Sequence, residues 1–183
     1  PRIQLWNAEK MEILHLCFQR TDALSDGVLH SVKKEKINFK EMLDSLHAIF
    51  AEKIHKSAIT VQTSIASELA PFWGDRLLIE VLLINAIGKP LHRVPKNGSV
   101  FVSLKEVPGF LQLEVQDNGY MGAENQIQNS LDLFITEEAF NHLCLNIGGG
   151  YQFMKVGGSN IAHIMMPVPK EEITNNNVVK LFP

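Results

Sequence analysis

Two places in the sequence carry polar residues that could bind a ligand. Asn85 lies near the end of a strongly apolar run, Leu77–Ile87, and Asp117-Asn118-Gly119 follows a stretch of alternating apolar and polar residues. Taken singly, each has an ordinary explanation, because Asp-Asn-Gly is a common turn and a helical asparagine can bond to a loop. Only their joint placement favours a binding site.

Other residues offer weaker candidates for chemistry. Cys17 and Cys144 lie far apart among apolar neighbours, so we interpret them as buried thiols in a reducing compartment rather than a disulfide or metal pair. The five histidines from His47 to His163 show no metal-ligand spacing.

Composition sets broad limits on function. The chain has 183 residues, 45% of them hydrophobic and 20% charged, with a net charge of −3. This balance is typical of one folded domain, and the lack of a basic run argues against nucleic acid as a partner. We find no signal peptide and no apolar stretch long enough to span a bilayer, and therefore expect a cytoplasmic location. Because the chain begins at Pro1 rather than Met, we expect it to be part of a longer protein.

Apolar periodicity predicts four helices. The first covers Ile3–Val32 and ends at the charged cluster Lys33–Lys36, and the second covers Phe39–Lys56. The third covers Leu77–Ile87, with Asp75 as N-cap and with Gly88 and Pro90 as its end. The fourth runs over Thr136–Ile147.

Alternating segments predict the strands, which are Ile59–Thr63, Val100–Leu104, Leu111–Val115, Tyr151–Val156 and Ile161–Met166. Strands in hairpins, with helices that can all cover one face, indicate a two-layer α/β sandwich with a mixed, mainly antiparallel sheet.

The order of these motifs resembles the ATP-binding domain of two-component sensor histidine kinases, the GHKL or Bergerat-type fold. Gly74–Ile87 is similar to the helix that carries the family's asparagine box, and Asp117-Asn118-Gly119 is similar to its first glycine box. The resemblance covers roughly 37–168. It implies three parts: a helical segment 1–36 resembling part of a dimerisation hairpin, an ATP-binding domain 37–169, and a tail 170–183.

The resemblance also implies roles for four residues. Asp117 would accept a hydrogen bond from the adenine amino group, and Gly119 would let the backbone approach the ring. Asn85 would hold Mg²⁺, and Lys89 would face the phosphates. The implied cofactor is Mg-ATP, if the site is retained, and no residue of the chain is expected to act as a catalytic nucleophile.

Several positions depart from the family's pattern. Val81 stands where active members have an acidic residue or asparagine, and Met121 stands where a second glycine is expected. The phosphate-binding glycine stretch falls on 135–138, which contains no glycine, and the lid before it is almost absent. Thr136 is instead predicted as an N-cap, with Glu137 and Glu138 in the first turn of the helix. We therefore predict weak or lost ATP binding.

The phosphoacceptor histidine is missing from its expected place as well. His15 and His30, on the first predicted helix, are more typical of packed or exposed residues than of a phosphorylated one. The apolar stripe of that helix predicts a homodimer, and the resemblance implies a response regulator or a partner kinase as binding partner.

Three functions remain open from the sequence. The first is the catalytic and ATP-binding region of a divergent sensor kinase, the cytoplasmic part of a longer sensor, with weak or lost ATP binding (a pseudokinase). The second is a scaffold like the histidine phosphotransferases, which binds response regulators without using ATP. The third is an interaction domain of similar shape with no role in signalling.

Overall fold

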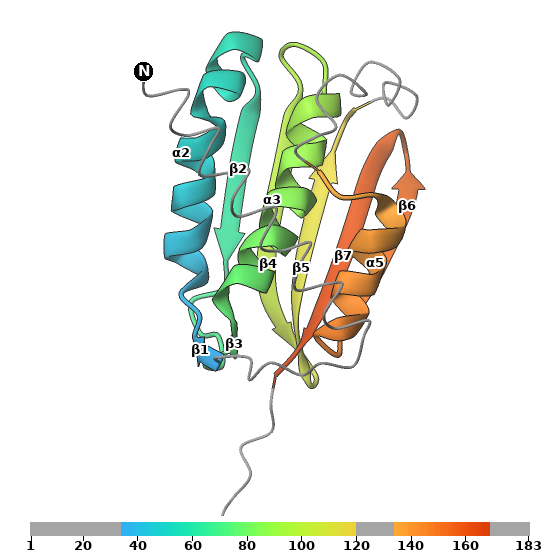
Figure 1. Ribbon diagram of the computed structural model, residues 1–183. Helices are drawn as coiled ribbons and strands as arrows, with labels where there is room; N and C mark the ends of the chain where they lie inside the picture. Colours follow the sequence, from blue (N-terminus) through green and yellow to red (C-terminus); the bar gives the residue numbers. More distant parts are fainter. Residues whose placement is uncertain (1–33, 120–133, 169–183) are drawn as a thin grey trace, which may run out of the picture.

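The computed structural model describes residues 34–119 and 134–168. This part of the chain forms two layers: a five-stranded sheet in the order β2-β4-β5-β7-β6, and three helices that lie over one face of it (Figure 1). β2 pairs with β4 in parallel, and the other neighbouring strands are antiparallel. The predicted fold class is therefore confirmed. The helices are α2 (Phe39–Ser57), α3 (Arg76–Arg93) and α5 (Glu137–Asn146); the strands of this sheet are β2 (Thr60–Ile65), β4 (Ser99–Val107), β5 (Phe110–Asp117), β6 (Gly150–Val156) and β7 (Ser159–Pro167).

The helices begin at side chains that satisfy their free backbone amides. Asp75 accepts hydrogen bonds from the amides of Leu77 and Leu78 at the start of α3. Thr136 accepts one from the amide of Ala139 at the start of α5. Both caps were predicted from the sequence, and both are confirmed.

The predicted end of α3 is wrong. Gly88 and Pro90 do not stop the helix, which continues to Arg93. A proline inside a helix removes one hydrogen bond, but the residues after it are packed: Leu91 is 1% exposed and the ring of His92 lies 5.3 Å from that of Phe134. This burial offsets the missing bond. The extra turn carries Arg93 to the end of the sheet where β5 finishes.

The sheet buries every second residue against the helices. In β5, Leu111, Leu113 and Val115 are fully buried, and Asp117 continues the same series at the end of the strand. The register pairs Asp117 with Asn160 of β7. Two polar side chains thereby enter the layer between sheet and helices at one end of a mainly apolar core.

A second, small sheet was not predicted. Lys34–Lys36, expected to end the first helix, forms β1 and pairs with β3 (Trp73–Asp75). The helix predicted over Ile3–Val32 and the tail 170–183 lie outside the described residues. Within the described ranges, no helix is long and apolar enough to cross a membrane.

Candidate functional site

Asp117 and Gly119 lie together at the end of β5, in a buried hydrogen-bonded cluster. The Asp117 Oδ1 accepts from the Gly119 amide and from the Asn160 Nδ2, each at 2.8 Å. The same Nδ2 also donates to the Gly119 carbonyl at 2.8 Å. Asp117 is 2% exposed and Asn160 is fully buried. Two hydrogen bonds to Oδ1, one from the backbone and one from a side chain, thus fix the direction of the carboxylate.

The remaining capacity of the Asp117 carboxylate is taken by Arg93. The Arg93 Nε lies 3.1 Å from both carboxylate oxygens, and its Nη2 donates to Oδ2. The guanidinium carbon lies 5.3 Å from the centre of the Phe153 ring, within the range of a cation–π contact. The Arg93 side chain is 13% exposed and that of Asp117 is 0% exposed. This is therefore a buried ion pair between the end of α3 and the end of β5.

Asn85 lies deep in the helix layer and bonds only to protein atoms in the described part of the chain. Its Nδ2 donates to the Val81 carbonyl at 2.9 Å, and its Oδ1 accepts from the Ile135 amide at 2.9 Å. The residue is 1% exposed. Asn85 thus ties α3 to the segment that leads into α5. The structure does not bring it into contact with Asp117.

Phe134 packs directly on α3, one turn after Asn85. A Cβ added at Gly88 would lie 2.5 Å from Phe134 Cε1 and 2.8 Å from Phe50 Cζ, so these two rings occupy the space that a side chain would need. The His92 ring meets Phe134 edge to face at 5.3 Å. A hydrophobic contact therefore joins α3 to the segment that leads into α5. Met121 lies outside the described residues.

Lys89 of α3 lies next to α5. The Lys89 Nζ lies 5.5 Å from the centre of the Phe140 ring of α5. Glu137 and Glu138 stand in the first turn of α5, as predicted. Burial, together with the negative charge of Glu137, raises the pKa of Tyr151 to about 12. Burial alone raises the pKa of Cys144 to about 12, and this cysteine is the buried thiol that the sequence predicts.

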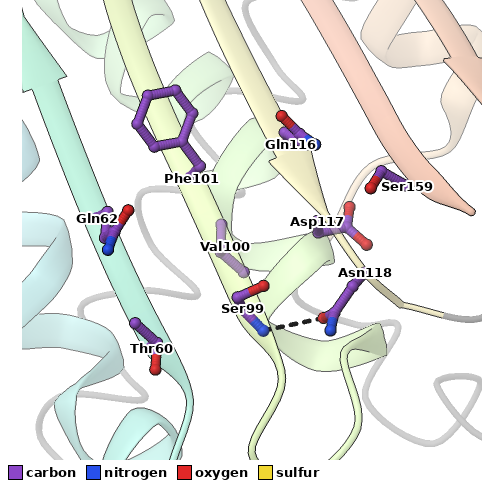
Figure 2. Close-up of a pocket in the computed structure, with 9 residues that line it drawn as sticks. All are labelled: Thr60, Gln62, Ser99, Val100, Phe101, Gln116, Asp117, Asn118 and Ser159. Carbon is purple, nitrogen blue, oxygen red and sulfur yellow. Dashed lines mark hydrogen bonds between the residues drawn. The ribbon is translucent and has the colours of Figure 1, made fainter. Parts of the chain in front are cut away.

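A separate cavity of about 360 Å³ opens on the other face of the sheet (Figure 2). The walls come from the ends of β2, β4, β5 and β7, and Asp117 is the one charged residue among them, with a carboxylate that is 0% exposed. That carboxylate bonds to Arg93 on the helix side. The lining contains no lysine or arginine, so the cavity offers no cation to a phosphate. Its residues are Thr60, Gln62, Ser99, Val100, Phe101, Gln116, Asp117, Asn118 and Ser159. Among the described residues, no group of three or more histidine, cysteine or acidic side chains could hold a metal ion.

Sequence reasoning missed Arg93 and Asn160. Nothing signalled Arg93, because Gly88 and Pro90 predict a helix that ends before it. Asn160 does have a signal: it has the same parity as the inward-facing Ala162 and Ile164, so it is a polar residue at a core position of an alternating strand.

The fold is that of histidine kinase catalytic domains. No protein-family model and no curated protein matches the sequence. Among solved structures, the histidine kinase AdeS of Acinetobacter baumannii is similar with a TM-score of 0.65 and 17% identity, over 89% of this chain and 77% of that one. The catalytic domain of histidine kinase ThkA gives 0.61 and 17%, over 74% and 98%. The cytoplasmic segment of histidine kinase QseC gives 0.63 and 17%, over 86% and 95%.

ThkA has also been solved in complex with the response regulator TrrA, and that kinase chain gives a TM-score of 0.63 and 16% identity, over 87% of this chain and 49% of that one. At these identities the likeness shows the fold. The resemblance stated from the sequence is thus confirmed as a fold: the chain folds as a histidine kinase ATP-binding domain.

Proposed function

We propose that this chain is the ATP-binding region of a divergent sensor histidine kinase, and that it acts in two-component signalling with weak or lost binding of Mg-ATP. The observation that carries the proposal is the ion pair between Arg93 and Asp117. In the family, this aspartate accepts a hydrogen bond from the adenine amino group. Here the Arg93 side chain stands where the adenine amino group would bind.

The metal position supports the same conclusion. A magnesium ion needs oxygen ligands that point toward it, and the Asn85 Oδ1 points to the Ile135 amide at 2.9 Å instead. Val81, which stands one turn earlier on α3, offers only an apolar side chain, and its carbonyl accepts the Asn85 Nδ2. A magnesium ion at Asn85 would therefore have to compete with the Ile135 amide for the Oδ1.

The phosphate position lacks its usual backbone donors. The amides at the start of α5 are partly satisfied by the Thr136 hydroxyl, which bonds to the Ala139 amide at 3.2 Å. Glu137 and Glu138 add negative charge in the first helical turn. Because like charges repel, a triphosphate next to these carboxylates would bind less tightly. The polyphosphate therefore gains little from this helix end. Lys89, whose Nζ lies over the Phe140 ring of α5, stays the predicted phosphate contact.

The partners follow from the fold rather than from a described interface. ThkA, which has this fold, binds a response regulator, and we propose the same class of partner, or a partner kinase, for this chain. We propose a cytoplasmic location, as for the segment of QseC, and a homodimer formed through the helix predicted over Ile3–Val32. A scaffold that binds response regulators without ATP is the second candidate, because the internal use of Asp117 and Asn85 fits it equally well.

Calorimetric titration of the purified chain with Mg-ATP and Mg-ADP tests the proposal. We expect no heat of binding up to millimolar nucleotide, with the same result for Asp117→Asn. Glu114→Gln is the matched control, since Glu114 lies on the same strand but bonds to His163 on the other face. Micromolar binding that is lost in Asp117→Asn and kept in Glu114→Gln would refute the proposal.

Titration with response regulators then separates the two candidates. Nucleotide binding too weak for calorimetry could still support a phosphoryl transfer that depends on added ATP, and such a transfer would favour the divergent kinase. Binding of a regulator without any effect of nucleotide would favour the scaffold.

A further inference from the structure

The Asp117 cluster selects a cation. Its carboxylate is 0% exposed, and removing a charge from water is favourable only when an opposite charge and hydrogen bonds replace the water. A neutral amino group can donate a hydrogen bond but cannot neutralise the charge. The cluster as it stands therefore fits a positively charged group better than it fits an uncharged base.

The geometry further selects a planar cation with N–H donors on one edge. The Nε and Nη2 of Arg93 both face the carboxylate, an arrangement that the fixed fork of a guanidinium provides and an ammonium does not. The face of the Phe153 ring lies 5.3 Å from the guanidinium carbon. A flat, weakly hydrated cation gains from this contact.

The hydrogen bonds among Asp117, Gly119 and Asn160 do not involve Arg93. Asn160 and the Gly119 amide hold the Asp117 Oδ1, each at 2.8 Å, and the Asn160 Nδ2 also reaches the Gly119 carbonyl. The Asn160 Oδ1 is buried and has no hydrogen-bond donor among the described residues. Buried acceptors are rarely left without a donor. The Asn160 Oδ1 could therefore accept a hydrogen bond from a further N–H donor, beyond those that Arg93 supplies.

Arg93 is placed where it could leave. It is the last residue of α3, so its side chain can move while Leu91 keeps the final turn packed on the core. The stem of Arg93 passes over Gly119, where an added Cβ would lie only 2.6 Å from Arg93 Cγ. Arg93 thus enters the cluster from a helix end and over a glycine.

We propose that Asp117, Asn160 and Phe153 form a binding site for guanidinium or amidinium cations, and that Arg93 fills this site as an internal ligand. The inference rests on the proposed function in one respect, namely that Asp117 no longer serves a neutral nucleobase. An external group of the same chemistry enters when the Arg93 side chain leaves the cluster. While the ion pair between Arg93 and Asp117 is formed, Arg93 blocks the position next to Asp117 where a nucleotide base would bind.

The test uses Arg93→Ala and thermal unfolding in about 20 mM guanidinium chloride, far below the molar concentrations that denature proteins. We expect Arg93→Ala to melt below the wild-type chain, and guanidinium to restore part of the loss while equal sodium or ammonium chloride does not. Arg76→Ala is the matched control, because Arg76 lies on the same helix and its side chain is 46% exposed in pairs with Glu41 and Glu80. Neither it nor the wild-type chain should gain from guanidinium.

The double variant Arg93→Ala/Asp117→Asn, which removes both charges, should fold and should not respond to guanidinium. The proposal is overturned if guanidinium stabilises Arg93→Ala no more than sodium does, or if it stabilises Arg76→Ala equally. It is also overturned if Arg93→Ala stays unfolded in guanidinium while the double variant folds. Stabilisation of Arg93→Ala by adenosine but not by guanidinium would show a nucleobase site instead. The Mg-ATP titration of the wild-type chain tests the proposed function separately.

Discussion

Replacing Asn85 with alanine tests whether this residue stabilises the fold or serves a metal. The variant loses the Nδ2 hydrogen bond to the Val81 carbonyl, which is worth about 0.5–1.5 kcal/mol. It also leaves the half-buried Ile135 amide without its acceptor, at a cost of about 1–3 kcal/mol. We therefore expect the free energy of unfolding to fall by about 1.5–4.5 kcal/mol in the absence of metal and nucleotide.

Urea denaturation in buffer with EDTA measures this change. Asn141→Ala is the control, because Asn141 is an exposed asparagine of α5 and such substitutions change stability by only about 0.5 kcal/mol or less. A different result would make Asn85 a metal ligand: without metal, Asn85→Ala would have the same free energy of unfolding as this control. Its free energy of unfolding would fall below that of wild type only when Mg-ATP is present. The internal hydrogen bonds described above would then be dispensable, and the reasoning would be refuted.

Two further predictions concern packing and pH. Gly88→Val should destabilise the chain by about 1–3 kcal/mol or more, measured by thermal unfolding, because its side chain would collide with Phe134 and Phe50; an unchanged melting temperature would contradict this packing. Because burial raises the pKa of Cys144 and of Tyr151 to about 12, above their usual 9.0 and 10.0, the unfolded chain loses these protons first as the pH rises. The free energy of unfolding should therefore fall between about pH 9 and about pH 12, and urea denaturation of Cys144→Ala/Tyr151→Phe should show a smaller fall; an equal fall would contradict the assignment.

Short-range sequence patterns predict much of the fold. Asp75 and Thr136 each cap the helix that follows them, because a side-chain oxygen within three residues of a free amide decides where a helix begins. The alternation in β5 places Leu111, Leu113 and Val115 on the buried face, since side chains of a strand point to its two faces in turn. The order of these elements was enough to identify the two-layer sandwich and its likeness to histidine kinase domains.

The state of the candidate site was not predictable in the same way. The sequence placed Asp117, Gly119 and Asn85 at the right elements, but not the partners that these residues have. Arg93 stands 24 residues before Asp117, and Asn85 stands 50 residues before Ile135. No pattern of period two or 3.6 links residues at such separations.

What the sequence by itself determined is therefore the main helices and strands and the fold class, because caps, turns and hydrophobic periods act over a few residues. Only the tertiary structure decided that α3 continues past Pro90, since burial of Leu91 against the core offsets a locally unfavourable residue. That added turn brings Arg93 to Asp117. Arg93 thus balances the charge of the buried Asp117 carboxylate, and only the packing of α3 on the sheet brings the two residues together.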